Sequence, residues 1–339
     1  MLIPEPEIVD PASVPTLRWG VIGPGGIAEV FVDACQKHTK QHFQAVASRT
    51  SGRADEFAAK FSIPDTHADY LSLVESDNID AVYIASWQYE HFEHAMLALN
   101  AGKHVLVEKP ITVLPEHARE IFKLAASKGL MAMEAMWTRY LPQSTVIRKL
   151  LAEGSLGAPQ LFAANFSVDN RHISRLWQKG GGSIIYDMGI YPIAMSQQFL
   201  GNPTKITAIG TLHESGLDAE SHSVFEYESG ARAQVTASGI ATLPTTASCS
   251  FENGVVVVEE PFFVPSGIRV RDKELYFEEQ AWFDETGIRG HEGLSYQATW
   301  FAKYVSEGRV ESEVHPASEV VAGIEIAAEI CRQIGAEPI

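Results

Sequence analysis

A lysine followed by a proline ends a short apolar segment in the first half of the chain. Residues 104–107 are typical of a strand buried on both faces of a parallel sheet, and Glu108, Lys109 and Pro110 follow directly. Ligands of a doubly wound sheet bind at the carboxyl ends of its strands, so we expect Lys109 to point into a cleft. Pro110 keeps Lys109 out of helical geometry, and the sequence leaves open whether their bond is cis. Lys109 is therefore a candidate catalytic residue, the alternative being a solvated lysine at a strand end.

An acid and a phenol form a second candidate cluster after the glycine-rich segment 180–182. Asp187 and Tyr191 are spaced i, i+4, so on a helix they share one face and can act on one bound molecule. Pro192 cannot donate to the carbonyl of Met188, which predicts a loosened turn at Tyr191. The alternative is a core tyrosine and an acid at a helix start.

A glycine-rich turn between a predicted strand (18–22) and a predicted helix (29–37) has the pattern G-x-G-x-x-A of dinucleotide-binding sites. Gly23 permits the tight turn, Gly25 lets the backbone approach a pyrophosphate, and Ala28 allows close packing of the helix on the strand. Free N–H groups at the helix start can then hold the phosphates. The cofactor-binding residues predicted from this turn are Gly23, Gly25, Gly26, Ile27 and Ala28.

The end of the next predicted strand (43–47) indicates which nicotinamide cofactor is preferred. NAD sites usually carry an acid here for the ribose 2′-hydroxyl, but the sequence has Ser48 and Arg49, with Arg53 a few residues on. The planar guanidinium of arginine suits a 2′-phosphate. We therefore predict NADP in preference to NAD, with Ser48, Arg49 and Arg53 as cofactor contacts. The alternative is an exposed arginine at a strand end.

Strands and helices continue to alternate, which predicts a parallel, right-handed, doubly wound sheet. Ser86 and Glu108, each at a strand end, complete the predicted cofactor contacts together with His91, which we expect to cap its helix or border the nicotinamide. His91 and His94 have no apparent third ligand, so no metal is predicted. The further elements expected in this half are strand 81–85, helix 91–100, helix 115–128 and strand 130–133.

The second half of the chain has a different pattern of predicted elements, in which strands follow one another and are separated by polar or glycine-containing turns. This pattern predicts an α+β domain with an open, mostly antiparallel sheet. We expect a nucleotide-binding domain over residues 1–136, including a loose leader over 1–15, and a second domain over 137–339. The elements expected in the second domain are helices 143–153, 294–307 and 317–334 and strands 161–168, 205–211, 222–227, 231–238, 245–251 and 255–259.

Size, charge and cysteine content restrict the class of protein. The 339 residues have a formal net charge of −17, which opposes binding to nucleic acid or to anionic membranes. The three cysteines show no metal-ligand or disulfide pattern. No apolar run reaches the roughly 20 residues needed to cross a bilayer, and no signal peptide is apparent. We therefore expect a cytoplasmic protein.

The segments 23–28, 108–110 and 182–191, in this order and spacing, resemble the signatures of the Gfo/Idh/MocA oxidoreductases. Within that family, residues 133–139 and 187–191 resemble the branch of dimeric dihydrodiol dehydrogenases and NADP-dependent D-xylose dehydrogenases. The resemblance implies an N-terminal Rossmann domain, a second domain used for homodimerisation and a small-molecule substrate bound in a cleft.

The resemblance also implies roles for individual residues. Lys109 takes the place of the family lysine that contacts the substrate hydroxyl and the nicotinamide ribose, and Asp187 that of the substrate-orienting acid. Tyr191 stands where most members have a catalytic histidine, a departure shared by this branch. The expected substrate-pocket residues are Trp137, Arg139 and Phe166.

This chemistry predicts hydride transfer between NADP and a CH–OH group of a sugar, polyol or trans-dihydrodiol. Tyr191 is expected to act as general base in oxidation and as acid in reduction, because a nearby ammonium such as that of Lys109 favours the ionised phenol. Two alternatives remain: a glycosidase-type enzyme that recycles bound NAD internally, and a non-catalytic nucleotide sensor.

Overall fold

The computed structural model describes residues 3–180, 182–273 and 279–337, and the chain divides into two compact units. The nucleotide-binding unit comprises Val9–Tyr140 and Arg289–Val321, and the sheet-rich unit comprises Met1–Ile8, Leu141–Ile288 and Ala322–Ile339. This grouping differs from the consecutive segments expected from the sequence, because part of the C-terminal region belongs to the nucleotide-binding unit. Gly181, within the glycine-rich segment 180–182, lies outside the described residues.

The first sheet is parallel throughout, with the strand order β3-β2-β1-β4-β5-β6. This is the order of a dinucleotide-binding fold, and it confirms the predicted doubly wound sheet. The central strands are buried on both faces, as their continuous apolar sequences predicted. The strands are β1 (Arg18–Ile22), β2 (His42–Ala47), β3 (Asp65–His67), β4 (Ala81–Ile84), β5 (His104–Val107) and β6 (Ala132–Glu134).

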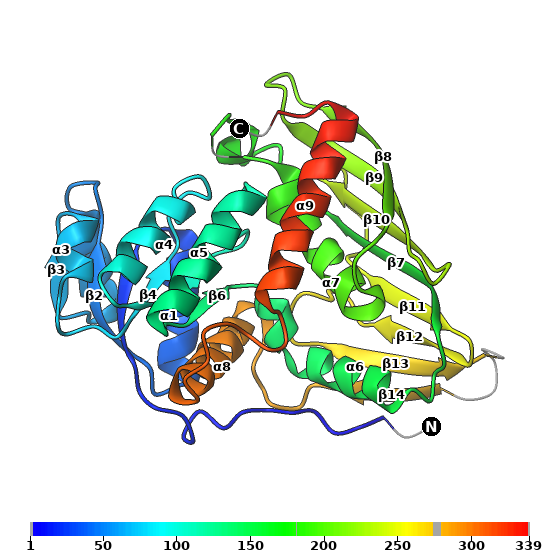
Figure 1. The fold of residues 1–339 in the computed structure, drawn as a ribbon, viewed down its shortest axis with the longest axis horizontal. Coiled ribbons are helices and arrows are strands. Elements are labelled where there is room, and N and C mark those ends of the chain that lie inside the picture. Colours follow the sequence, from blue (N-terminus) through cyan, green and yellow to red (C-terminus); the bar gives the residue numbers. More distant parts are fainter. Residues whose placement is uncertain (1–2, 181, 274–278, 338–339) are drawn as a thin grey trace. The chain divides into compact units, whose positions relative to one another are not determined.

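Helices of the nucleotide-binding unit follow the strands in alternation (Figure 1). They are α1 (Gly26–His38), α2 (Arg53–Phe61), α3 (Tyr70–Val74), α4 (His91–Asn100), α5 (Pro115–Lys128) and α8 (Leu294–Ser306), with short 3₁₀ turns η1 (Trp137–Tyr140) and η4 (Gly290–Gly293). Helix α8 packs on α1, and the ring of Phe301 lies 5.0 Å from that of Trp19 in β1. Burial of these aromatic rings explains why α8 joins this unit.

The second sheet is open and mostly antiparallel, as predicted, with the order β14-β13-β12-β11-β7-β10-β9-β8. Strands β7 and β10 are its parallel pair among the described pairings. The sequence did not predict β13 and β14. The strands are β7 (Pro159–Ser167), β8 (Lys205–Leu212), β9 (Asp218–Glu226), β10 (Arg232–Ser238), β11 (Ala247–Phe251), β12 (Gly254–Val258), β13 (Gly267–Asp272) and β14 (Glu279–Phe283).

Helix α7 packs against the face of β7 in this unit (Figure 1). A π-helical segment, η3 (Ile185–Gly189), leads into α7 (Ile190–Leu200). The widened segment ends before Tyr191, where the loosened turn was predicted, and both Tyr191 and Pro192 lie in the first turn of α7. The remaining helices are α6 (Pro142–Glu153), η2 (Ser174–Trp177) and α9 (Ala317–Ile334).

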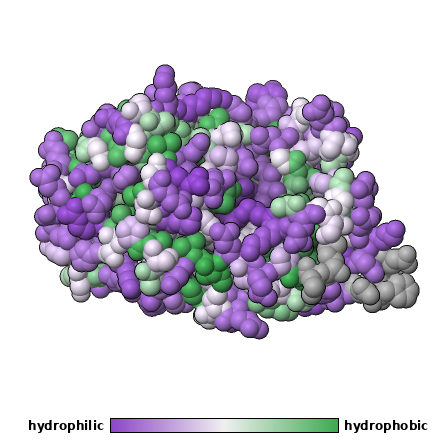
Figure 2. Space-filling view, turned by 60° about the horizontal axis from the view of Figure 1, so that its bottom comes forward, coloured by the Kyte–Doolittle hydropathy of each residue, from purple (hydrophilic) through white to green (hydrophobic). Residues whose placement is uncertain are grey.

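Hydrophilic side chains predominate on the face shown in Figure 2, with hydrophobic ones interspersed among them. Such a surface accords with the acidic composition of the chain. In the part of the chain that the structure describes, no helix combines the length and apolarity required to cross a membrane.

Candidate functional site

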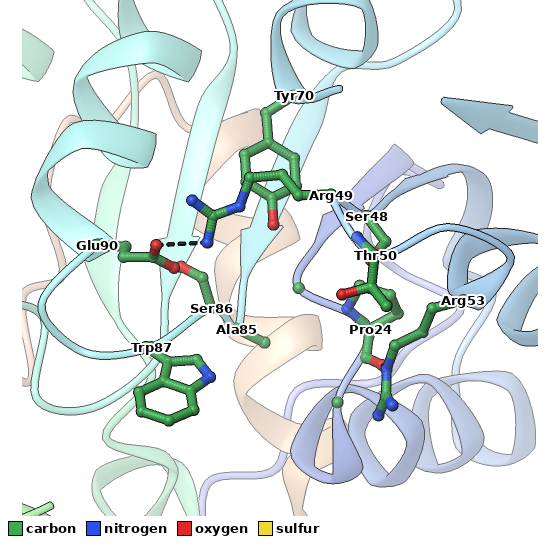
Figure 3. A pocket seen from close by; sticks show the side chains of 12 residues that line it. Pro24, Ser48, Arg49, Thr50, Arg53, Tyr70, Ala85, Ser86, Trp87 and Glu90 are labelled. Atoms are coloured by element: carbon green, nitrogen blue, oxygen red, sulfur yellow. Dashed lines mark hydrogen bonds and ion pairs between the residues drawn. The ribbon is translucent and has the colours of Figure 1, made fainter. Parts of the chain in front are cut away.

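A cavity of about 340 Å³ opens at the carboxyl ends of β1, β2 and β4 in the nucleotide-binding unit (Figure 3). This edge is where a doubly wound sheet binds ligands, next to the point at which the strand order reverses. The residues that line it are Gly23, Pro24, Gly25, Ser48, Arg49, Thr50, Arg53, Tyr70, Ala85, Ser86, Trp87 and Glu90.

The glycine-rich turn forms one wall of this pocket. Gly23 has φ +81°, and a Cβ built on it would lie 2.6 Å from the backbone nitrogen of Ser86, so a side chain is excluded by both conformation and space. A Cβ on Gly25 would lie 3.9 Å from its nearest neighbour, which leaves room beside the turn for a ligand. No side chain caps α1, so the N–H groups of its first turn can donate to a diphosphate.

Arg49 reaches across the pocket from the end of β2 (Figure 3). Its Nη2 donates to Oε1 of Glu90, and its guanidinium lies 5.4 Å from the ring centre of Tyr70. The hydrogen bond to Glu90 raises the pKa of Arg49 above its ordinary value. The guanidinium is therefore cationic and held over an aromatic ring, as suits the binding of an anionic group.

The other residues predicted at this strand end hold the turns together. Arg53 Nε donates to the carbonyl of Pro24 at 2.9 Å, linking the start of α2 to the glycine-rich turn. Ser48 Oγ accepts from the backbone N–H of Thr50 at 3.1 Å. The pocket thus combines arginine side chains with a glycine-rich turn that a hydrogen bond from Arg53 holds in place.

The two histidines of α4 are buried and hydrogen-bonded. His91 Nδ1 lies 2.9 Å from the carbonyl of Pro110 and its Nε2 lies 3.0 Å from that of Ser86, while burial lowers its pKa. These contacts tie the turn after β5 to the turn after β4. His94 Nδ1 lies 2.8 Å from Ser86 Oγ, and its pKa falls to about 4, chiefly through burial.

The segment around Lys109 lies at the end of β5, and the Lys109–Pro110 peptide bond is cis. Glu108 is buried, accepts from the hydroxyl of Tyr83 at 2.6 Å and accepts from the backbone N–H of Lys109 at 3.2 Å. Burial raises the pKa of Glu108 to about 7. The carboxyl group therefore braces the backbone from which the Lys109 side chain projects.

A buried polar network supports the residue after Pro110. Ile111 donates its backbone N–H to Glu134 Oε1 at 2.8 Å, and the other oxygen of Glu134 lies 2.9 Å from His315 Nε2. His315 Nδ1 lies 3.5 Å from Glu319. These contacts hold the turn after β5 against the segment that follows α8.

Two residues predicted to line a substrate pocket lie within the nucleotide-binding unit. Arg139 is buried and donates to the carbonyl of Val314 at 2.7 Å and to Glu319 at 2.6 Å. These bonds hold its buried guanidinium in an ion pair, and its predicted contact with the substrate stays a prediction. Trp137 is also buried, and its ring stacks on that of His291 at 5.6 Å.

Tyr191 lies in an aromatic cluster of the sheet-rich unit. Its ring centre is 5.5 Å from that of Phe166 and 5.9 Å from that of Phe263, and the two phenylalanines stack at 4.6 Å. Phe166 thus meets Tyr191, and Phe263 packs on both rings. The cluster fixes the phenol ring on α7 against β7.

Asp187 lies in the π-helical segment four residues before Tyr191, with Arg175 Nη2 at 3.8 Å from its carboxylate. Asp218 of β9, which is fully buried, accepts from the N–H of Ile185 at 2.6 Å and anchors the start of this segment. Gly182 is required at its entry, because a Cβ there would lie 1.9 Å from the carbonyl oxygen of Leu176. No sequence motif indicated the contribution of Asp218.

The structure therefore assembles the predicted residues into separate groups. Those that line the pocket are Gly23, Gly25, Ser48, Arg49, Arg53 and Ser86, and those outside its lining are Gly26, Ile27, Ala28, His91, Glu108 and Lys109. Ala28 is buried, as its predicted packing role requires. Sequence reasoning did not select the pocket residues Tyr70, Trp87 and Glu90. For Glu90, its place in the turn after a predicted strand was an available signal.

Comparison with protein families gives two matches that together span much of the chain. The model of the oxidoreductase family with an NAD-binding Rossmann fold, Gfo/Idh/MocA, matches residues 17–136. The model of the GFO/IDH/MocA C-terminal domain matches residues 145–258.

Curated relatives match this chain over nearly its whole length. Trans-1,2-dihydrobenzene-1,2-diol dehydrogenase of Mus musculus is 32% identical over 325 residues, covering 94% of this chain and 97% of the relative. The Homo sapiens protein of the same name is 32% identical over 324 residues, covering 94% of this chain and 97% of that protein.

The fold is shared with solved structures of lower identity. A levoglucosan dehydrogenase in complex with NADH and levoglucosan has a TM-score of 0.84 at 20% identity, covering 94% of this chain and 97% of the other. KijD10, a 3-ketoreductase from Actinomadura kijaniata in complex with NADP and TDP-benzene, has a TM-score of 0.81 at 24% identity, covering 94% and 98%.

Proposed function

The chain belongs to the Gfo/Idh/MocA oxidoreductase family, and on that premise we propose that it is an NADP-dependent dehydrogenase acting on a CH–OH group of a sugar, polyol or trans-dihydrodiol. The observation that carries the choice of cofactor is the pair Arg49 and Arg53 lining the pocket at the end of β2, where an NAD site usually has an acid. A 2′-phosphate would be bound by the guanidinium of Arg49.

The residues of the pocket fit a nicotinamide dinucleotide. The open side of Gly25 and the uncapped start of α1 can hold the diphosphate, while Ser48 and Ser86 supply hydroxyl groups beside it. When bound, the cofactor supplies the acceptor for hydride in oxidation. The chain itself binds the nucleotide, orients the substrate and moves the proton.

We assign the proton transfer to Tyr191, which acts as base when the alcohol is oxidised and as acid in the reverse direction. Lys109 anchors the substrate hydroxyl and favours the ionised phenol, and Asp187 orients a neighbouring hydroxyl. Phe166 and Trp137 remain proposed substrate contacts. The aromatic packing of Tyr191 supports this assignment, because a fixed ring keeps the hydroxyl in one position.

The substrate class is supported by the relatives at about one-third identity, which are named trans-1,2-dihydrobenzene-1,2-diol dehydrogenases. Aldoses, inositols and trans-dihydrodiols should be screened with NADP⁺ and NAD⁺ in parallel by the absorbance of the reduced cofactor. We expect reduction of NADP⁺ with one of these classes and a loss of roughly 10²–10⁴-fold in Lys109→Met. Failure of every class with both cofactors would contradict the proposal. If the protein held NAD tightly and released no reduced cofactor into solution, internal recycling of the bound NAD would be favoured.

We also propose that the protein forms a homodimer through the second sheet. Its strands expose apolar side chains, among them Ile209 at 70%, Leu161 at 49% and Val224 at 43%. Sedimentation should show a dimer that Ile209→Glu dissociates, since a charge on this face would be buried at the interface. A wild-type monomer at micromolar concentration would contradict this proposal.

A further inference from the structure

Glu90 is the one acidic residue among the described side chains that line the nucleotide pocket. It lies in the turn between β4 and α4, and its own N–H donates to the carbonyl of Trp87 at 2.8 Å. Its carbonyl accepts from the N–H of His94 at 3.1 Å in the first turn of α4. The backbone of Glu90 is therefore fixed, and its carboxylate enters the pocket from the side opposite Arg53 (Figure 3).

The carboxylate of Glu90 engages the arginine that the proposed function assigns to the 2′-phosphate. Arg49 Nη2 donates to Glu90 Oε1, and Figure 3 shows the guanidinium turned toward Glu90 and away from Thr50 and Arg53. The Arg49 side chain is 59% exposed and that of Glu90 is 27% exposed, so both are accessible to a ligand in the pocket.

A carboxylate in this position has opposite effects on the two cofactors. The 2′-phosphate of NADP carries up to two negative charges, so Glu90 repels it and competes with it for Arg49. The 2′-hydroxyl of NAD can instead donate a hydrogen bond to a carboxylate. In NAD sites this hydrogen bond is usually accepted by an acidic residue at the end of β2. Glu90 thus supplies, from a different strand end, the group that β2 lacks.

We infer that Glu90 is a cofactor-selectivity residue whose carboxylate weakens binding of NADP relative to NAD, so that the enzyme accepts both. This inference rests on the proposed use of NADP through Arg49.

The test measures binding, without substrate, by calorimetry on the full chain. Dissociation constants of NADP⁺ and NAD⁺ are compared in wild type and Glu90→Gln, with 2′,5′-ADP and 5′-AMP as probes that isolate the 2′-phosphate. We expect Glu90→Gln to tighten NADP⁺ and 2′,5′-ADP roughly three- to tenfold, while NAD⁺ and 5′-AMP are unchanged or weaker. The gain should shrink at high salt, because the repulsion is screened.

Glu93→Gln is the matched control, because Glu93 is an exposed acid in the first turn of α4, three residues after Glu90, and does not line the pocket. It should leave all four constants unchanged. Weaker NADP⁺ binding in Glu90→Gln, or no change with either cofactor, would overturn the inference. Arg49→Met tests the proposed function separately: if NADP⁺ binding survives that change, the assignment of Arg49 to the 2′-phosphate fails whatever Glu90→Gln does.

Discussion

The nucleotide pocket and the Tyr191 cluster are built in different ways. The pocket is formed by turns that leave neighbouring parallel strands, so backbone geometry at positions such as Gly23 decides its shape. The Tyr191 cluster is formed by side chains of a helix, a strand and a loop, and ring packing with Phe166 and Phe263 decides its shape. We therefore expect the first site to respond sharply to glycine substitutions and the second to respond gradually to changes in packing.

The largest effect should come from a methyl group on the glycine-rich turn. In Gly23→Ala the new Cβ would meet the backbone of Ser86 at 2.6 Å and would occupy a left-handed conformation, at a cost of several kcal/mol. Thermal unfolding and calorimetric titration with NADP⁺ should show loss of both stability and binding. In Gly25→Ala, where the nearest neighbour is 3.9 Å away, binding should be lost while stability remains. Equal stability of the two variants would contradict this account.

Glu108 should make the stability of the nucleotide-binding unit depend on pH. Burial raises its pKa from 4.5 to about 7, so the folded state holds a proton that the unfolded state loses. The stabilisation is complete below about pH 4.5 and is lost as the pH rises to about 7. Glu108→Gln mimics the neutral acid. The unfolding free energy of this variant minus that of wild type should therefore rise over this pH range by at most about 3 kcal/mol. Urea unfolding at several pH values would measure this difference in unfolding free energy. A difference that does not change with pH would contradict the role assigned to Glu108.

The smallest effect should come from the packing around Tyr191. Phe263→Leu removes a ring that stacks on Phe166 and meets Tyr191, so kcat should fall about three- to tenfold as the phenol becomes less fixed. Phe251→Leu is the matched control: its ring packs on Phe199 at 6.2 Å elsewhere in the unit. The control should lower stability but keep kcat. Equal kcat in both variants would mean that ring packing does not position Tyr191.

The difference between the sites also explains how far each could be predicted. The parallel sheet, the glycine-rich turn and the arginines at the end of β2 follow from local sequence rules, because parallel strands bring their carboxyl ends together. Glu90, in the turn before α4, and Tyr70, at the start of α3, enter the same pocket without a sequence motif. Phe263 and Asp218 reach the Tyr191 segment through tertiary packing, which residue spacing along one strand or helix does not encode.

Secondary structure shows the same division. Strand β3 has three residues, too few for an alternating pattern. Strand β13 does alternate, with buried Ile268 and Val270 beside Arg269 and Arg271, so its signal was present in the sequence. Helix α2 does have apolar residues at helical spacing, Ala54, Phe57, Ala58 and Phe61, so its signal was present in the sequence.

The most direct test of the proposed mechanism is the turnover of Tyr191→Phe at saturating NADP⁺ with a substrate found in the screen. The change removes only the hydroxyl and keeps the ring that packs on Phe166 and Phe263. We predict a fall in kcat of roughly 10²–10⁴-fold with the dissociation constant of NADP⁺ unchanged. Wild-type kcat in this variant would show that Tyr191 does not transfer the proton.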